Sequence, residues 1–232
     1  MDIVYTLSNN YDREELKYSL RSLANLPHGR VFFVGGCPTW VQGVTHIPTV
    51  QNGTKYKNTT HNLITACNDP RISANFILFN DDFFVLEPIK APTKELNLYN
   101  GTVQSVLDKL NERYDTPTPY MSGMSQTKEF LAILGVTDPK SYELHIPFVL
   151  NKKKFLKIFD LPGVSEIPCF HKRTVYGNLY LNGGTNTPDV KVFIRDGFMP
   201  NPGKFLSCDN AGFSIVYNYL QTRFPHKSQY EI

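Results

Sequence analysis

The chain has 232 residues, enough to bury one sizeable core, and this length suggests a single domain over residues 1–232. Hydrophobic residues make up 41% and charged residues 19%, which excludes a disordered chain, and the longest apolar runs are too short to cross a bilayer. The formal net charge of +3 is compatible with a phosphate-rich substrate or with nucleic acid, and it is evidence for neither.

The first ninety residues alternate strand-like and helix-like segments. Strands are expected at 3–7, 31–34, 44–50 and 76–79, and helices from about Asp12, with Leu16, Leu20 and Leu23 on one face, and from about Asn58, with Leu63, Ile64 and Cys67 buried. The run from Phe76 to Phe79 is apolar throughout, as is typical of a strand covered on both faces. Strands joined by helices predict right-handed crossovers and a mostly parallel sheet.

The second half of the sequence is less regular. Apolar spacing predicts helices around 103–110, 130–134 and 155–159, with a loop at 135–140. A last helix is expected to turn Phe213, Val216, Tyr217, Leu220 and Phe224 inward, with Asp209 as its N-cap.

The four cysteines and the N-terminus bear on location. The cysteines are widely spaced without a CxxC pair, and the chain starts directly in a strand-like segment without a basic n-region. We therefore expect a cytoplasmic protein with free thiols and no signal peptide. The sequons at Asn52, Asn58 and Asn100 are then chance matches.

Polar segments follow three of the predicted strands. Ser8-Asn9-Asn10, Gly35-Gly36 and Asn80-Asp81-Asp82 each come at the point where a strand ends. In open parallel sheets ligands bind outside the carboxyl ends of the strands. We therefore expect these three segments to line one crevice.

The segment Asn80-Asp81-Asp82 is the strongest chemical signal. A buried apolar strand delivers two adjacent carboxylates, and the aromatic pair Phe83-Phe84 follows at once. Desolvation and mutual repulsion both disfavour the two charges, and a hard cation removes both penalties. Because Mg²⁺ and Mn²⁺ are typically held by one or two carboxylates together with substrate phosphates, we predict a divalent metal here. The alternative is that the pair caps a helix or turn.

Glu143 and His145 are expected on one side of an extended segment, because side chains alternate along it. His145 is a candidate metal ligand or phosphate-orienting residue. Glu143 is a candidate general base that deprotonates an acceptor hydroxyl. The alternative for His145 is an ordinary core or surface histidine, and the residues alone do not rank the two roles.

Four further residues are candidates for contacts to substrate. Arg173 suits a diphosphate group, with an ordinary surface arginine as the alternative. Asp209 is either a catalytic or acceptor-binding carboxylate or only the N-cap named above. Lys55 and Asn58 follow the third strand, where a helix N-terminus favours phosphates.

Several common motifs are missing from the sequence. It contains no GxxxxGK[ST], no GxGxxG after the first strand, no GxSxG and no HExxH. The usual support for a P-loop ATPase, a dinucleotide oxidoreductase, an α/β-hydrolase or a zincin is therefore lacking.

Five blocks occur in a specific order: Asp2–Thr6, Leu20–Leu23, Arg30–Val34, Pro38–Val41 and Phe79–Phe84. This set resembles the core of the Stealth family of capsular-polysaccharide phosphotransferases and, more broadly, GT-A-type glycosyltransferases. His145-Ile146-Pro147, with Asn151-Lys152-Lys153, looks like the later histidine block of that family. The resemblance covers about 2–90 well and 142–155 moderately. The short chain also resembles small bacteriophage glycosyltransferases, some of which modify hydroxymethylated bases in DNA.

The resemblance implies a single GT-A-like (Rossmann-like) domain, with 1–90 binding a nucleotide-sugar donor such as a UDP-sugar and 91–232 forming the acceptor side. Asp81 and Asp82 take the DxD role of holding Mn²⁺ or Mg²⁺, and His145 takes the later histidine. Contacts to the donor are expected from Thr6, Ser8, Lys55, Asn58, Asn80, Asp81 and Arg173. Two departures stand out, because Asn80 replaces the first aspartate of many DxD motifs and Gly35-Gly36 replaces an acidic residue.

These features together predict a metal-dependent glycosyltransferase that moves a sugar from a nucleotide-sugar to an acceptor hydroxyl. The acceptor expected by analogy is a hydroxymethylated base of phage DNA, flipped out of the duplex in the bacterial host cytosol. The enzymatic alternative is a Stealth-like transfer of sugar-1-phosphate to a glycan. The non-enzymatic alternative is a module that binds glycan or nucleic acid without turnover.

Overall fold

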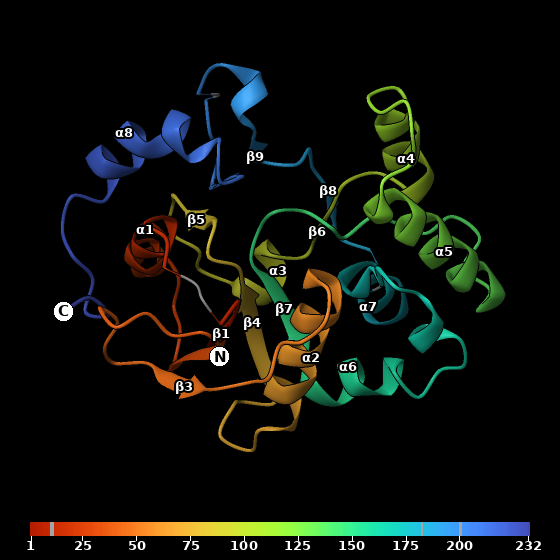
Figure 1. Cartoon of the computed structure of the whole chain (residues 1–232), viewed down its shortest axis with the longest axis horizontal. Helices are drawn as coiled ribbons and strands as arrows, with labels where there is room; N and C mark the ends of the chain where they lie inside the picture. The colour runs from red at the N-terminus through yellow and green to blue at the C-terminus, as the bar shows by residue number, and fades with distance from the viewer. Residues whose placement is uncertain (10–11, 182, 200) are drawn as a thin grey trace.

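The computed structural model describes residues 1–9, 12–181, 183–199 and 201–232 of the chain (Figure 1). Asn10, the last residue of the predicted turn after the first strand, lies outside these residues. Within them, no helix is both long enough and apolar enough to span a membrane.

A five-stranded sheet in the order β3-β2-β1-β4-β7 forms the centre of the molecule. Its strands are β1 (Asp2–Leu7), β2 (Val31–Gly35), β3 (Thr45–Ile47), β4 (Asn75–Phe79) and β7 (Phe148–Asn151). The pairs β3-β2, β2-β1 and β1-β4 are parallel, and β7 at the edge runs antiparallel to β4. The prediction of an α/β fold with a mostly parallel sheet is therefore confirmed.

Both faces of this sheet are covered by helices. Side chains of β1 alternate between the faces, so Val4 belongs to the cluster on the side of α2 (Lys55–Asn68) and Tyr5 to the cluster on the side of α1 (Glu15–Ser22). All six residues of β1 are buried, as the apolar run predicts for a strand between two helical layers.

Two smaller sheets, which sequence patterns did not predict, lie beside the central one. The first has the order β5-β10-β9, formed by β5 (Phe83–Val85), β10 (Phe205–Cys208) and β9 (Lys191–Val192). In it β10 is antiparallel to β5 and parallel to β9. The second pairs β6 (Leu98–Tyr99) with β8 (Thr185–Asn186).

The remaining helices belong mainly to the second half of the chain. They are α3 (Pro92–Glu95), α4 (Val103–Asn111), α5 (Pro119–Ile133), α6 (Lys152–Ile158), α7 (Lys172–Tyr180) and α8 (Phe213–Arg223), with single 3-10 turns at Leu23–Asn25, Val164–Glu166 and Ile194–Asp196. Figure 1 shows α1 and α8 together at one end of the molecule and α4 with α5 at the other.

The two helices of the first half begin at other residues than predicted. Helix α1 begins at Glu15 rather than near Asp12. Helix α2 begins at Lys55 rather than Asn58, because the side chain of Thr54 accepts a hydrogen bond from a backbone N–H in the first turn and caps the helix earlier. The predicted strand at 44–50 is limited to β3.

The predicted N-cap of the last helix was wrong. Helix α8 begins at Phe213, and Gly212 stands at its N-cap without a side-chain cap. Oδ1 of Asp209 instead accepts a hydrogen bond from the N–H of Gly212 at 2.6 Å. The carboxylate therefore closes the turn that precedes α8 rather than the helix itself.

The carboxyl ends of β1, β2 and β4 lie at one edge of the sheet, because the three strands pair in parallel. A Cβ on Gly36 would lie 2.1 Å from the carbonyl oxygen of Ser8, so only glycine permits this approach between the ends of β1 and β2. Tyr5 and Phe79 are partners in the parallel register of β1 and β4. β4 ends at Phe79 and β1 two residues after Tyr5, so the segments that follow them leave the sheet at the same edge.

Candidate functional site

The segment Asn80-Asp81-Asp82 connects β4 of the central sheet with β5 of the smaller one. Nζ of Lys191 donates to Oδ2 of Asp82 at 3.0 Å, and the two side chains are 15% and 17% exposed. The second oxygen of Asp82, Oδ1, is buried and receives no hydrogen bond from the part of the chain that the structure describes. Asp82 is therefore a half-satisfied carboxylate next to a lysine.

Strand register explains why Lys191 meets Asp82. Ser207 of β10 is the partner of Phe83 on one side and of Lys191 on the other. Phe83 follows Asp82 directly, so the three-stranded sheet brings β9 across from the end of the acidic segment.

Further carboxylates lie near the same point. Burial raises the pKa of the Cys208 thiol, and the charges of Asp82 and Glu15 raise it further. Glu15 is itself buried, which raises the pKa of its carboxyl, and Asp82 adds to that shift. Asp209 follows Cys208, and its N–H donates to the carbonyl of Val192 in β9 at 3.1 Å.

A polar cavity of about 600 Å³ opens beside this cluster. Its basic side chains are Lys55, Lys109, Arg113, Lys191 and Arg195, and its carboxylates are Glu143, Asp189, Asp196 and Asp209. We refer to it as the polar cavity.

The structure places four of the predicted site residues in the wall of the polar cavity: Lys55, Glu143, His145 and Asp209. The other predicted site residues, Thr6, Ser8, Asn58, Asn80, Asp81, Asp82 and Arg173, are not among its lining residues. Asp82 is linked to the cavity through its ion pair with Lys191, which does line it.

His145 is held by Asp189, a residue that the sequence patterns did not single out. Nδ1 of His145 lies 2.6 Å from Oδ2 of Asp189, and the backbone N–H of His145 donates to Oδ1 at 2.9 Å. Burial opposes ionisation of Asp189, but His145 and the backbone N–H groups outweigh it and lower the pKa of this carboxyl. No residue that the structure describes hydrogen-bonds Nε2, which leaves that nitrogen for a ligand.

Glu143 is part of a closed cluster. Its Oε2 accepts from Nε of Arg173 at 3.3 Å, and its Oε1 accepts from the N–H of Thr174 at 3.1 Å. Burial opposes ionisation, but the charges of Arg173, His171 and Lys172 outweigh it and lower the pKa of Glu143 to about 2. A carboxylate so stabilised in its charged form is a weak base at neutral pH, which argues against its predicted role as general base.

Arg173 and Asn58 have structural partners. Nη1 of Arg173 donates to the carbonyl of Leu144 at 2.7 Å in addition to the bond with Glu143. The side-chain amide of Asn58 both accepts from the N–H and donates to the carbonyl of Gly53, each at 2.9 Å. Their predicted contacts to a donor would compete with these bonds.

The predicted metal set of Asp81, Asp82 and His145 is not brought together. In the described ranges of the chain, no group of three or more His, Cys, Asp and Glu side chains is placed to hold a metal ion. Yet the buried, unpartnered Oδ1 of Asp82 suits a cation held by one or two carboxylates and completed by phosphate oxygens. Asp82 therefore fits a divalent metal whose remaining ligands come mainly from a phosphate group.

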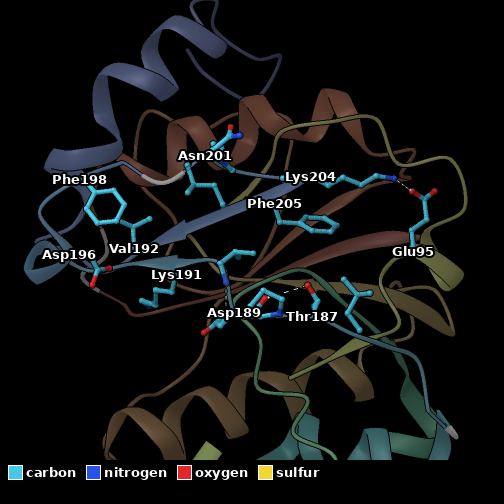
Figure 2. A pocket seen from close by; sticks show the side chains of 16 residues that line it. Glu95, Thr187, Asp189, Lys191, Val192, Asp196, Phe198, Asn201, Lys204 and Phe205 are labelled. Atoms are coloured by element: carbon cyan, nitrogen blue, oxygen red, sulfur yellow. Dashed lines mark hydrogen bonds and ion pairs between the residues drawn. The ribbon is translucent and has the colours of Figure 1, made fainter. Parts of the chain in front are cut away.

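A second, mainly apolar cavity of about 660 Å³ lies next to the polar one and shares Asp189, Lys191 and Asp196 with it. Figure 2 shows Phe198 and Val192 at one end of this apolar cavity and the ion pair between Lys204 and Glu95 at the other. Lys204 Nζ and Glu95 Oε2 are 2.6 Å apart. The segment 187–192 therefore borders both cavities.

Sequence reasoning missed three residues of the site: Glu15, Asp189 and Lys191. One local signal was present for two of them, because Asp189 and Lys191 alternate with Val190 and Val192 as in a strand with one polar side. For Glu15 the sequence carries no such signal, since a glutamate in the first turn of a helix is commonly exposed.

No protein-family model matches the chain, and no curated protein matches its sequence. Solved structures do match its fold. The galactosyltransferase LgtC in complex with donor and acceptor sugar analogs aligns over 99% of this chain and 98% of that chain, with a TM-score of 0.55 and 12% identity. An active-site mutant of LgtC aligns over the same shares with a TM-score of 0.54 and 12% identity. The chain thus shares the GT-A-type fold of LgtC.

Proposed function

We propose that the chain is a glycosyltransferase that binds a nucleotide-sugar donor with its diphosphate in the polar cavity. The observation that carries this proposal is the position of Asp82. It lies in the turn that follows β4 of a GT-A-type sheet, and one of its oxygens has no partner among the described residues. It also pairs with Lys191, which lines a cavity with five basic side chains. Lysine and arginine are the side chains that bind phosphate.

The donor is proposed to extend from the polar cavity towards the carboxyl ends of β1 and β2. Lys55 begins α2, whose N-terminus adds a favourable dipole for phosphates, and it lines the cavity. Thr6 belongs to β1, and Ser8 follows the end of that strand, next to Gly36. With Asn80, they are the proposed contacts to the nucleoside.

A divalent metal, Mn²⁺ or Mg²⁺, is proposed to bind Asp82 and Asp81 together with the donor phosphates. When bound, such an ion neutralises the charge that develops on the diphosphate leaving group. The role of His145 as a third metal ligand is replaced in this proposal by a role towards the acceptor.

In the proposed transfer, the bond between the anomeric carbon of the sugar and the diphosphate oxygen breaks, and a bond from that carbon to the acceptor oxygen forms. The proton of the acceptor hydroxyl goes to Nε2 of His145, which Asp189 orients through Nδ1. Asp209, which lines the same cavity, is the proposed acceptor-binding carboxylate. Glu143 is proposed to position the wall of the cavity rather than to take a proton.

The acceptor is proposed to enter through the apolar cavity, because that cavity meets the polar one at Asp189 and Lys191. Phe198 is 65% exposed and offers a ring on which a sugar or a nucleobase stacks. A hydroxymethylated base of DNA and a glycan both remain proposed acceptors, and the site of the reaction is proposed to be the cytoplasm.

The test is turnover with product identification. The chain is incubated with a panel of nucleotide-sugars, Mn²⁺, and either hydroxymethylated DNA or simple glycans, and the products are identified by mass spectrometry. A nucleoside diphosphate and a glycosylated acceptor are expected. Release of nucleoside monophosphate would favour Stealth-like transfer of sugar-1-phosphate. Binding of a donor without any released nucleotide across the panel would favour a binding module and contradict the proposal.

A further inference from the structure

We propose that Lys191 is an exchangeable counterion: it pairs with Asp82 in the ligand-free protein and moves to the donor diphosphate on binding, so that a divalent cation binds Asp82 only together with the nucleotide. This inference rests on the proposed function of the polar cavity. It names a residue and a binding order that the proposed glycosyl transfer alone does not require.

The first argument is the state of the Asp82 carboxylate. Both side chains of the ion pair are more than four-fifths buried, and burial makes an unpaired charge costly. Lys191 satisfies one oxygen of Asp82 at 3.0 Å, while the other is buried and receives no hydrogen bond within the described residues. The ammonium therefore pairs with one oxygen of Asp82, but it leaves the other oxygen without a partner among these residues.

The second argument is competition. The ammonium of Lys191 lies where a cation on the same carboxylate would be repelled by it. The described residues also contain no group of three His, Cys, Asp or Glu side chains that would outweigh this repulsion. A divalent cation therefore needs ligands from elsewhere, and phosphate oxygens supply them.

The third argument is that Lys191 has a second position available. It is anchored by its backbone in β9, through the register with Ser207, and its side chain is a flexible four-carbon stem. It lines the polar cavity, where other basic side chains already face the space proposed for the diphosphate. Figure 2 shows Lys191 on the same segment as Asp189 in the wall of the apolar cavity, and both residues also line the polar cavity.

The exchange makes nucleotide and metal binding cooperative. A diphosphate that draws Lys191 from Asp82 removes the repulsion on the cation, and the cation in turn binds the diphosphate. By linkage, the factor by which the nucleotide tightens metal binding equals the factor by which the metal tightens nucleotide binding. Removing the ammonium should therefore reduce both factors alike.

The test measures Mn²⁺ affinity of the full chain by electron paramagnetic resonance, with and without saturating UDP, for the wild type, Lys191→Met, Lys191→Gln and Lys204→Met. The last variant is the control, because Lys204 is also paired with a carboxylate and directly precedes β10, but does not line the polar cavity. Melting temperatures establish that each variant is folded, and two substitutions of Lys191 guard against one that fails to fold.

We expect UDP to tighten Mn²⁺ binding by the wild type and by Lys204→Met at least tenfold. Lys191→Met and Lys191→Gln should bind Mn²⁺ without UDP at least tenfold more tightly than the wild type, and UDP should then add little. Equal Mn²⁺ affinity of the folded Lys191 variants and the wild type without UDP would overturn the inference. That comparison uses no nucleotide, so it stands even if UDP does not bind and the proposed function fails.

Discussion

Two carboxylates, Glu143 and Asp82, are buried to a similar degree and each is paired with a basic side chain, yet their surroundings differ. Both oxygens of Glu143 accept hydrogen bonds, from Arg173 and from the N–H of Thr174. One oxygen of Asp82 accepts from Lys191, and the other receives none from the described residues. We call the Glu143 cluster closed, because both carboxylate oxygens accept hydrogen bonds, and the Asp82 cluster open, because one oxygen accepts none from these residues. A closed cluster contributes to stability and leaves no oxygen for a ligand, whereas an open one can still bind a ligand.

The largest expected effect comes from opening the closed cluster. Arg173→Met leaves the carboxylate of Glu143 buried without its main cation, which should lower the free energy of unfolding by about 3–5 kcal/mol. Urea denaturation measures the change. Arg71→Met, which removes an exposed partner of Asp69, is the control and should change stability little. If both substitutions lower the free energy of unfolding by the same small amount, the Glu143 cluster does not stabilise the fold.

Low pH should remove the same contribution to stability without a mutation, because it protonates Glu143. The pKa of Glu143 is lowered from 4.5 to about 2 in the folded chain, so its contribution is fully present above pH 4.5 and is lost as the pH falls towards 2. This corresponds to roughly 3 kcal/mol of stability. Comparing the pH dependence of the urea midpoint in the wild type and in Glu143→Gln isolates this group. The variant should have the shallower slope below pH 4.5; parallel curves would refute the prediction.

The pair of His145 and Asp189 lies between these two cases. Nδ1 of His145 is bonded to Asp189, whereas Nε2 has no hydrogen-bond partner among the described residues. Asp189→Asn should lower kcat about 10- to 100-fold, since the imidazole loses its orienting carboxylate, while KM for the donor changes little. Steady-state kinetics with a donor and acceptor identified by the product screen gives both constants. A raised KM with unchanged kcat would instead assign Asp189 to substrate binding.

The smallest effect on stability is expected at the open cluster. Asp82→Asn removes the charge from a carboxylate that is already half-satisfied, and Lys191 can turn to the water of the polar cavity. The free energy of unfolding should therefore fall by only about 1 kcal/mol. If Asp82→Asn lowers the free energy of unfolding as much as Arg173→Met does in the same urea series, the two clusters contribute equally to stability and the comparison is wrong.

The fold was predictable where its signals are local. The apolar runs of β1 and β4 and the spacing of Leu16 and Leu20 indicate buried strands and an amphipathic helix without knowledge of their partners. The sheet of β5, β10 and β9 has no such signal. Phe84 pairs with Leu206, which lies about half the chain away in sequence. Strands of two to four residues are also too short to show a period.

The same distinction separates the parts of the candidate site. Asp81 and Asp82 could be singled out because their unusual feature, adjacent carboxylates after a buried strand, lies within one segment. The closed state of Glu143 depends on Arg173 in α7, and the partner of Asp82 depends on the register of three short strands. Pairings of this kind arise from tertiary structure, so the sequence could indicate the carboxylates but not their states.

The central claim is that Asp82 and the polar cavity bind the donor, and melting of three proteins with UDP and Mn²⁺ tests it most directly. Saturating ligand should raise the melting temperature of the wild type and of Lys204→Met by about 5 °C or more. Asp82→Asn, folded and almost as stable, should show no such shift. A shift of equal size in Asp82→Asn, or none in the wild type with any nucleotide-sugar, would contradict the account.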